Sequence, residues 1–161
     1  MIHCQEASLA LRPIRHKDVS ALYGILTHPE VGRYNDYAVP SNPSEVQDII
    51  QGDIELLLTG EGVRMAILYQ EQVVGSCGIY DAHTKVAKIG YELLPLFWGR
   101  GLMHLALSLL LSEGQQYMGA DVTTVQAQVH LDNLRSIKLL QRLGFVCSEP
   151  GVYQLPWPPR S

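Results

Sequence analysis

The residues best placed for chemistry form a loop between a short apolar strand and an apolar helix. The loop consists of Trp98, Gly99, Arg100, Gly101, Leu102 and Met103. A strand–loop–helix step of this kind points successive backbone N–H groups at one place before the helix N-terminus, where the helix dipole favours negative charge. Glycines there let the backbone approach a ligand closely. The pattern predicts a phosphate-binding loop, with a plain strand-to-helix turn as the alternative, because short glycine motifs are frequent false positives.

Two polar residues stand at the beginning of a later predicted helix. Asn133 and Ser136 are three residues apart and therefore lie on one face of that helix. The alternative is structural, because asparagine is a common N-cap and a nearby serine is often only solvated. No G-K-[S/T] accompanies the glycines of the loop, so a nucleoside triphosphate is a poor fit.

Periodicity predicts the elements that would position these residues. An edge strand is expected at 8–15, followed by a helix that Asp18 caps and that His28-Pro29 ends. Further strands are predicted at 63–70, 72–80, 86–93, 122–129 and from Phe145. Further helices are predicted from Asn42 to about Leu58, at 100–117 with a stop at Gly119, and at 133–143. We expect residues 29–41 to be a loop and the proline-rich tail to give at most one short strand.

The order of these elements predicts the fold class. A three-stranded antiparallel meander is followed by a strand–helix–strand unit over 86–129, which implies a parallel pair beside the meander. The expected architecture is therefore α+β, with a mixed, mostly antiparallel central sheet and helices on both of its faces. At 161 residues, we expect one domain over 1–161.

Composition excludes several classes of protein. The net charge is −4 and no basic cluster is present, which argues against nucleic-acid binding, while a mildly acidic surface suits cationic amines. Three scattered cysteines predict reduced thiols in a cytoplasmic protein, with no disulfide framework and no metal site. The longest apolar run, 102–111, is too short for the ~20 residues that span a membrane. We expect a monomer or a homodimer.

The motifs resemble the GNAT superfamily of N-acetyltransferases. Residues 98–103 are similar to the acyl-CoA pyrophosphate loop of that family, [Q/R]-x-x-G-x-[G/A], although Trp98 and Met103 depart from it. The sequences NLRS at 133–136 and LGF at 143–145 resemble the N-x-x-S…G-F block. LRPI, D-x-x-x-L-Y and HPEV near the start resemble the RimJ/RimL-like branch, so the resemblance covers about residues 9–146 in order. It implies a GNAT-like sheet and acetyl-CoA as the cofactor.

The resemblance also implies a reaction centre. The strand before the loop is expected to bulge at Leu93 and Leu94 and to splay from the next strand, which opens a slot for the thioester. A backbone N–H there would bind the carbonyl oxygen on which negative charge develops. Asn133 would position the cofactor arm, and Ser136 would hydrogen-bond or protonate the leaving thiolate. Many relatives carry a tyrosine four residues after this serine, where the present chain has Leu140.

The predicted acceptor is a primary amine that attacks the thioester directly, because no cysteine lies in a motif that would support a covalent acyl-enzyme. Glu92 is the candidate general base, as an acid on the strand that leads into the loop. Period-two alternation places Tyr91 on the opposite face, so we expect only one of the two side chains to point into the slot. Lone histidines are weaker candidates, namely His83, His104 and His130.

The acceptor itself stays open. Tyr34, Tyr37 and Glu92 are expected to contact it, with the two tyrosines lying in the 29–41 segment. The branch resemblance points to the N-terminal α-amine of a protein. The alternatives are a small-molecule amine, such as a polyamine, an amino acid or an antibiotic, and a non-catalytic module that holds CoA without turnover.

Overall fold

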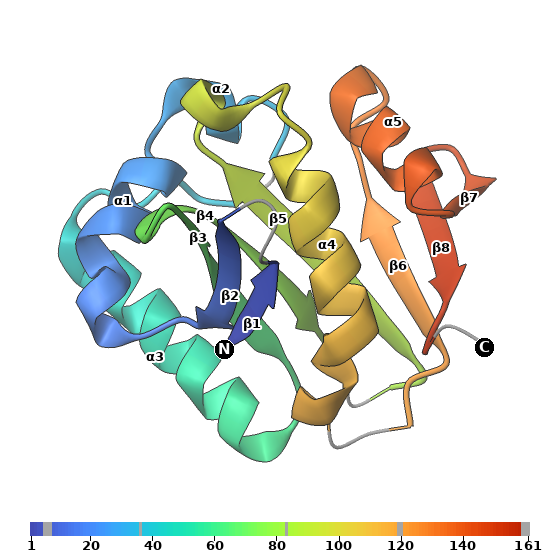
Figure 1. Cartoon of the computed structure of the whole chain (residues 1–161), viewed down its shortest axis with the longest axis horizontal. Coiled ribbons are helices and arrows are strands. Elements are labelled where there is room, and N and C mark those ends of the chain that lie inside the picture. The colour runs from blue at the N-terminus through green and yellow to red at the C-terminus, as the bar shows by residue number, and fades with distance from the viewer. Residues whose placement is uncertain (5–7, 36, 83, 119–120, 159–161) are drawn as a thin grey trace.

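The computed structural model describes residues 1–4, 8–35, 37–82, 84–118 and 121–158, and this part of the chain forms one eight-stranded sheet (Figure 1). The strands are β1 (Ile2–Cys4), β2 (Leu9–Pro13), β3 (Val63–Tyr69), β4 (Gln72–Tyr80), β5 (Val86–Leu93), β6 (Thr124–Gln128), β7 (Val146–Glu149) and β8 (Val152–Pro156). The α-helices are α1 (Val19–Leu26), α2 (Pro29–Gly32), α3 (Pro43–Thr59), α4 (Leu102–Glu113) and α5 (Leu134–Arg142). None of the helices in these ranges has the length and hydropathy needed to cross a lipid bilayer.

The sheet has the order β1-β2-β3-β4-β5-β6-β8-β7. Neighbouring strands are antiparallel throughout except for β5 and β6, which are parallel and are connected through α4. This confirms the predicted mixed, mostly antiparallel sheet. The three-stranded meander of β3, β4 and β5 is also confirmed, and Gln70 and Glu71 take positive φ angles in its first turn.

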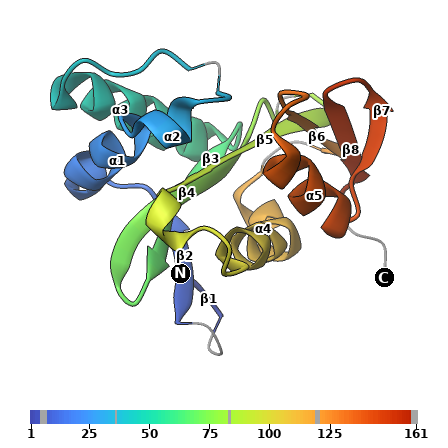
Figure 2. The ribbon, with the colours of Figure 1, turned by 90° about the horizontal axis from the view of Figure 1, so that it is seen from above.

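Helices cover both faces of the sheet, as predicted (Figure 2). On one face α1 and α3 pack through Leu22, Leu26, Val46 and Ile50, which lie against Ala66 of β3. On the other face α4 is buried through an apolar side that belongs to the larger core cluster. That cluster extends to Leu140 of α5 and Tyr153 of β8. The two faces of β5 therefore meet different helices.

Four expectations need correction. β2 was predicted as an edge strand, but β1 pairs with it on the side away from β3, so it lies inside the sheet. Residues 29–41 were predicted as a loop, but they contain α2, which His28 caps through Nδ1. The helix predicted at 100–117 is α4 followed by a 3₁₀ turn at Gly114–Tyr117. β7 begins at Val146 rather than Phe145. The expected stop at Gly119 lies outside the described residues.

The last described residues complete the sheet. The tail forms β8, which inserts between β6 and β7, so the expectation of at most one short strand is confirmed. Trp157 after this strand is 2% exposed, and its indole N–H donates to the carbonyl of Leu111 over 2.7 Å. The C-terminal segment is thus tied to α4.

A buried ion pair joins β2 to the beginning of α1. Asp18 is the N-cap residue, as predicted, but its carboxylate makes no capping bond and instead accepts two hydrogen bonds from Arg12, of 2.7 and 2.8 Å. The two side chains are only 5% and 4% exposed. Burial alone would raise the pKa of Asp18, but Arg12 and the backbone N–H of Arg15 hold that pKa below its usual value.

Replacing Arg12 with methionine tests this pair. Arg12→Met keeps the side-chain volume but leaves a buried carboxylate without its partner, so we expect a loss of about 3–5 kcal/mol in the free energy of unfolding. Urea denaturation at neutral pH measures it. Arg15→Met, at an exposed position with the same change in charge, is the control and should cost far less. Equal losses in the two variants would contradict the assignment.

Candidate active site

A cleft lies where β5 and β6 separate. The two strands pair through residues 86–88 and 124–126 only, within the part of the chain that the structure describes, and β5 then continues to Leu93 paired with β4 alone (Figure 1). The cleft has a volume of about 650 Å³. Its walls come from the free half of β5, the loop and first turn of α4, the end of β6, α5, and the segment 30–35. The predicted splay is therefore present.

The predicted bulge at Leu93 and Leu94 is wrong. The register between β4 and β5 is unbroken over residues 88–93, and the N–H of Leu94 continues it by donating to the carbonyl of Val74 over 2.9 Å. The irregularity lies instead between β3 and β4, at Ile67 and Leu68. Antiparallel pairing alternates the direction of backbone groups, so the N–H of Leu93 points away from β4, toward the cleft. Of the two predicted donors, only Leu93 is available.

The loop before α4 has the backbone expected of an anion site. Gly99 and Gly101 have φ angles of 76° and 74°, and a Cβ added at either would meet nothing within 4 Å. Gly101 is the N-cap and offers no capping side chain. The N–H groups of residues 102–104 have no hydrogen-bond partner among the described residues. Unpartnered N–H groups at the positive end of a twelve-residue helix fit a pyrophosphate.

Trp98 joins this loop to both sides of the cleft. Its indole N–H donates to the carbonyl of Leu93 over 2.8 Å, and the guanidinium of Arg135 lies 3.6 Å from its ring centroid. The tryptophan that departs from the family pattern therefore fastens the loop to β5 and α5. Arg100, in contrast, lies over the ring of Phe97 at 5.7 Å and does not line the cleft.

Charge is unevenly distributed around the cleft. The side formed by α4 and α5 carries cationic or titratable groups at His104, Arg135, Lys138 and Arg142. The opposite side carries Glu30 and Glu92, together with Arg33, and Asp132 precedes α5. The basic side suits the phosphates of a cofactor, and the carboxylate of Glu92 suits a cationic acceptor.

Asn133 and Ser136 begin α5 as predicted. Asn133 is the N-cap, and its Oδ1 accepts a hydrogen bond of 3.3 Å from the N–H of Ser136. The hydroxyl of Ser136 hydrogen-bonds to the hydroxyl of Tyr91, a residue for which we predicted no role. Burial raises the pKa of Tyr91 to about 12. Leu140, at the position where relatives carry a tyrosine, is fully buried in the core.

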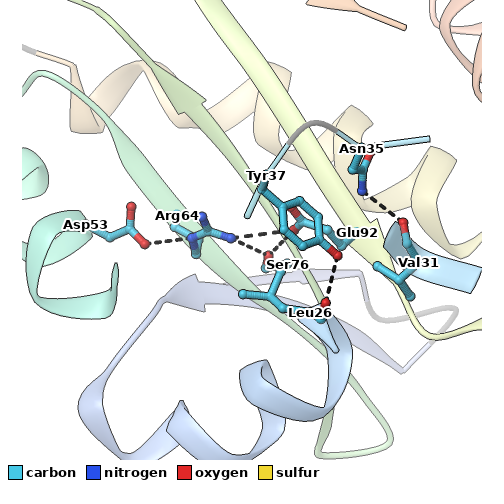
Figure 3. Close-up of polar contacts among 8 residues, drawn as sticks. All are labelled: Leu26, Val31, Asn35, Tyr37, Asp53, Arg64, Ser76 and Glu92. Atoms are coloured by element: carbon cyan, nitrogen blue, oxygen red, sulfur yellow. Dashed lines mark hydrogen bonds and ion pairs between the residues drawn. The ribbon is translucent and has the colours of Figure 1, made fainter. Parts of the chain in front are cut away.

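The expectation that only one of Tyr91 and Glu92 reaches the slot is wrong. The two side chains do lie on opposite faces of β5, but both residues line the cleft because, within the described residues, no strand pairs with that edge of β5 beyond Lys88. Tyr91 reaches α5 on one face. On the other, Oε2 of Glu92 accepts a 2.5 Å hydrogen bond from the hydroxyl of Ser76 and lies 3.5 Å from Nη1 of Arg64 (Figure 3).

The 29–41 segment lies beside Glu92. Tyr37 is drawn next to this carboxylate in Figure 3, and its hydroxyl donates to the carbonyl of Leu26 over 2.9 Å. Burial, and then the charge of Glu92, raise the pKa of Tyr37. Tyr34 lines the cleft, with its ring 5.3 Å from that of His130. Tyr37 and Leu94 do not line the cleft, and the histidine candidate His83 lies outside the described residues.

Fold and site together define an acyltransferase of the acetyl-CoA type. Residues 8–146 match the Acetyltransferase (GNAT) domain family. The chain is also 32% identical over 141 residues to the uncharacterised N-acetyltransferase p20 of Bacillus licheniformis, an alignment that covers 85% of this chain and 78% of p20. The chain therefore belongs to the GNAT acetyltransferase family. Acetyltransferase activity, with acetyl-CoA as the acetyl donor, follows from this membership.

Two solved structures show the same fold. RimL, the ribosomal L7/L12 α-N-protein acetyltransferase crystallised with CoA, superposes with a TM-score of 0.81 at 20% identity, over 98% of this chain and 99% of RimL. The microcin C7 self-immunity acetyltransferase MccE, crystallised with acetyl-CoA and AMP, gives 0.77 at 20% identity, over 92% of each chain. At the level of fold, the similarity to RimL agrees with the predicted RimJ/RimL-like branch.

The loop assignment predicts a charge-specific loss of CoA binding. Gly101→Asp places a carboxylate beside the expected phosphates, whereas Gly101→Asn places a neutral side chain of the same size at the same left-handed position. We expect the aspartate variant to bind CoA at least about tenfold more weakly than the asparagine variant, a difference of about 1.4 kcal/mol. Calorimetric titration with CoA measures both. Equal affinities would show that no phosphate lies at α4.

Proposed function

We propose that this chain transfers an acetyl group from acetyl-CoA to a primary amine by direct attack in a ternary complex. The observation that supports it most strongly is the separation of β5 from β6. Around that one gap lie the carboxylate of Glu92, the N–H of Leu93 and the hydroxyl of Ser136. These groups suit the three requirements of the reaction, which are proton removal, stabilisation of a developing oxyanion and support of a leaving thiolate.

The basic side of the cleft is the proposed cofactor side. The N–H groups at the start of α4 would hold the pyrophosphate, and Asn133 would contact the arm that leads to the thioester. Bound acetyl-CoA supplies the thioester carbon that the amine attacks. The N–H of Leu93 would donate to the oxygen that gains negative charge, because it has no partner in the β4–β5 ladder.

Glu92 is the proposed general base. A carboxylate beside the cleft attracts an ammonium group and can accept its proton before or during attack. Tyr37 lies beside this carboxylate but does not line the cleft, and its hydroxyl donates to the carbonyl of Leu26, so we propose a packing role for its ring. Tyr34, which lines the cleft, is the better candidate for contact with the acceptor.

Ser136 and Tyr91 are the proposed support for the leaving thiolate. An ordinary thiol has a pKa of about 8.5, so its anion is a weak base near neutral pH and needs only a hydrogen-bond donor. The hydrogen bond between the two hydroxyls holds Ser136 in place, and the raised pKa of Tyr91 keeps that phenol protonated.

We propose the N-terminal α-amine of a protein as the acceptor. The similarity to RimL extends over nearly the whole of both chains, and RimL acts on the α-amine of ribosomal L7/L12. MccE supports the alternative of a small-molecule amine, because its complex contains acetyl-CoA and AMP and it confers immunity to microcin C7.

The proposal also covers the domain organisation, the location and the oligomeric state of the protein. We propose a single domain over 1–161, acting in the cytoplasm as a monomer or homodimer without nucleic acid. Support for the location comes from Cys4, Cys77 and Cys147, which are free thiols.

An amine panel tests the activity. The purified chain is incubated with acetyl-CoA and either short peptides with free N-termini, the same peptides with blocked N-termini, polyamines or amino acids. Release of free thiol is measured. We expect turnover with free but not with blocked peptides. Turnover with small amines only would overturn the protein acceptor, and CoA binding without thiol release across the panel would indicate a non-catalytic module.

Removing the proposed base tests the mechanism. Glu92→Gln keeps the size of the side chain and its contact with Ser76 but cannot accept the proton, so we expect kcat to fall by about 10²-fold or more. The dissociation constant of CoA should stay unchanged. Steady-state kinetics and calorimetry measure the two quantities, with Glu149→Gln on the exposed strand β7 as the control. A wild-type kcat in Glu92→Gln would remove Glu92 from this role.

A further inference from the structure

Four polar side chains form a continuous series of contacts that starts on α3 and crosses the sheet to β5 (Figure 3). Asp53 of α3 accepts a 2.7 Å hydrogen bond from Nε of Arg64 on β3. Nη1 of Arg64 donates to the hydroxyl of Ser76 on β4 over 3.1 Å, and that hydroxyl donates to Glu92. The chain therefore leads from a helix on one face of the sheet to the cleft.

All four side chains of this series are largely buried. The side chains of Asp53, Arg64 and Glu92 are 8%, 14% and 13% exposed, and Ser76 is fully buried. Buried ion pairs contribute little stability relative to apolar residues of the same volume, because charges are costly to remove from water. A contribution to stability is therefore a weak explanation for these buried charged side chains, the last of which is Glu92 of the cleft.

The contacts distinguish the two oxygens of Glu92. Both Ser76 and Arg64 act on Oε2. Among the described residues Oε1 accepts no hydrogen bond, and Glu92 is one of the residues that line the cleft. The described contacts therefore hold one oxygen of Glu92 and leave the other without a hydrogen bond among the described residues.

We propose that Arg64 and Ser76 are positioning residues that fix Glu92 with Oε1 toward the acceptor amine, and that Asp53 controls this by sharing the guanidinium of Arg64. The inference rests on the proposed role of Glu92 as general base. It assigns to α3, which does not line the cleft, an effect on how the base is held.

The carboxylates of Asp53 and Glu92 share the guanidinium of Arg64. Replacing Arg64 and replacing Asp53 should therefore have opposite effects on Glu92. Without the charge of Arg64, Glu92 and Asp53 face each other with no cation between them, and the two carboxylates repel each other. Without the charge of Asp53, the whole charge of Arg64 acts on Glu92 and attracts its carboxylate more strongly. The other titratable groups beside Glu92 in the described ranges are Tyr37, Cys77 and Tyr80. Burial raises the pKa of all three, so they stay neutral near pH 7.

The test is the dependence of kcat on pH, with one amine and saturating acetyl-CoA, in three variants. In Arg64→Gln we expect the fall of kcat at acid pH (the acid limb) to begin at a higher pH, with a lower maximal kcat. In Asp53→Asn we expect it to begin at a lower pH. Arg64→Lys keeps the charge and should return the limb close to its wild-type position. Asp48→Asn, on the exposed side of α3, is the matched control and should leave the limb in place.

Residues that only stabilise the fold would not shift the pH profile of kcat in opposite directions when Arg64 and Asp53 are replaced. If Arg64→Gln does not fold, as judged by circular dichroism and CoA affinity, Arg64→Lys and Asp53→Asn still decide the question. Unmoved acid limbs in the folded variants, alongside an impaired Glu92→Gln, would overturn the positioning role and leave the base in place. A wild-type profile in Glu92→Gln would instead remove the base itself.

Discussion

The separation of two strands is the constraint on which the site depends. β5 and β6 pair through residues 86–88 and 124–126 in the described part of the chain, and β5 then runs on to Leu93 with one edge open. β4 holds the other edge in an unbroken register. A strand fixed on one side and open on the other presents backbone N–H groups to a ligand without losing its own geometry. A 3₁₀ turn at Pro95–Phe97 leads from the end of this strand to the glycine loop and the first turn of α4.

The open edge also makes both faces of β5 usable. Tyr91 reaches Ser136 of α5 on one face, and Glu92 reaches Ser76 and Arg64 on the other. In a closed sheet, period-two alternation would separate these two side chains, and only one would reach a given site. Here the groups proposed for proton removal and for thiolate support approach one cleft from opposite sides of the sheet.

Sequence alone predicted the features that depend on local order along the chain. Three such features depend on residues close in sequence and are present in the structure. They are the glycine loop with positive φ angles at Gly99 and Gly101, the N-cap at Asn133 and the meander of β3 to β5. The contact of Tyr91 with Ser136 joins residues 45 apart, and that of Arg64 with Glu92 depends on the register of three strands, so neither was predicted. A clue was present in the arginine within the otherwise apolar run 63–69. The pairing of β1 with β2 was missed because a three-residue strand gives too little pattern.

Amide hydrogen exchange followed by NMR tests the central claim most directly, because it identifies which backbone N–H groups a cofactor occupies. Saturating acetyl-CoA, which carries the thioester carbonyl, should slow exchange at Leu93 and at residues 102–104, whose N–H groups have no partner in the described structure. The N–H of Leu94, already bonded to Val74, should change little. Protection that appears elsewhere, with Leu93 and residues 102–104 unchanged at saturation, would contradict the account.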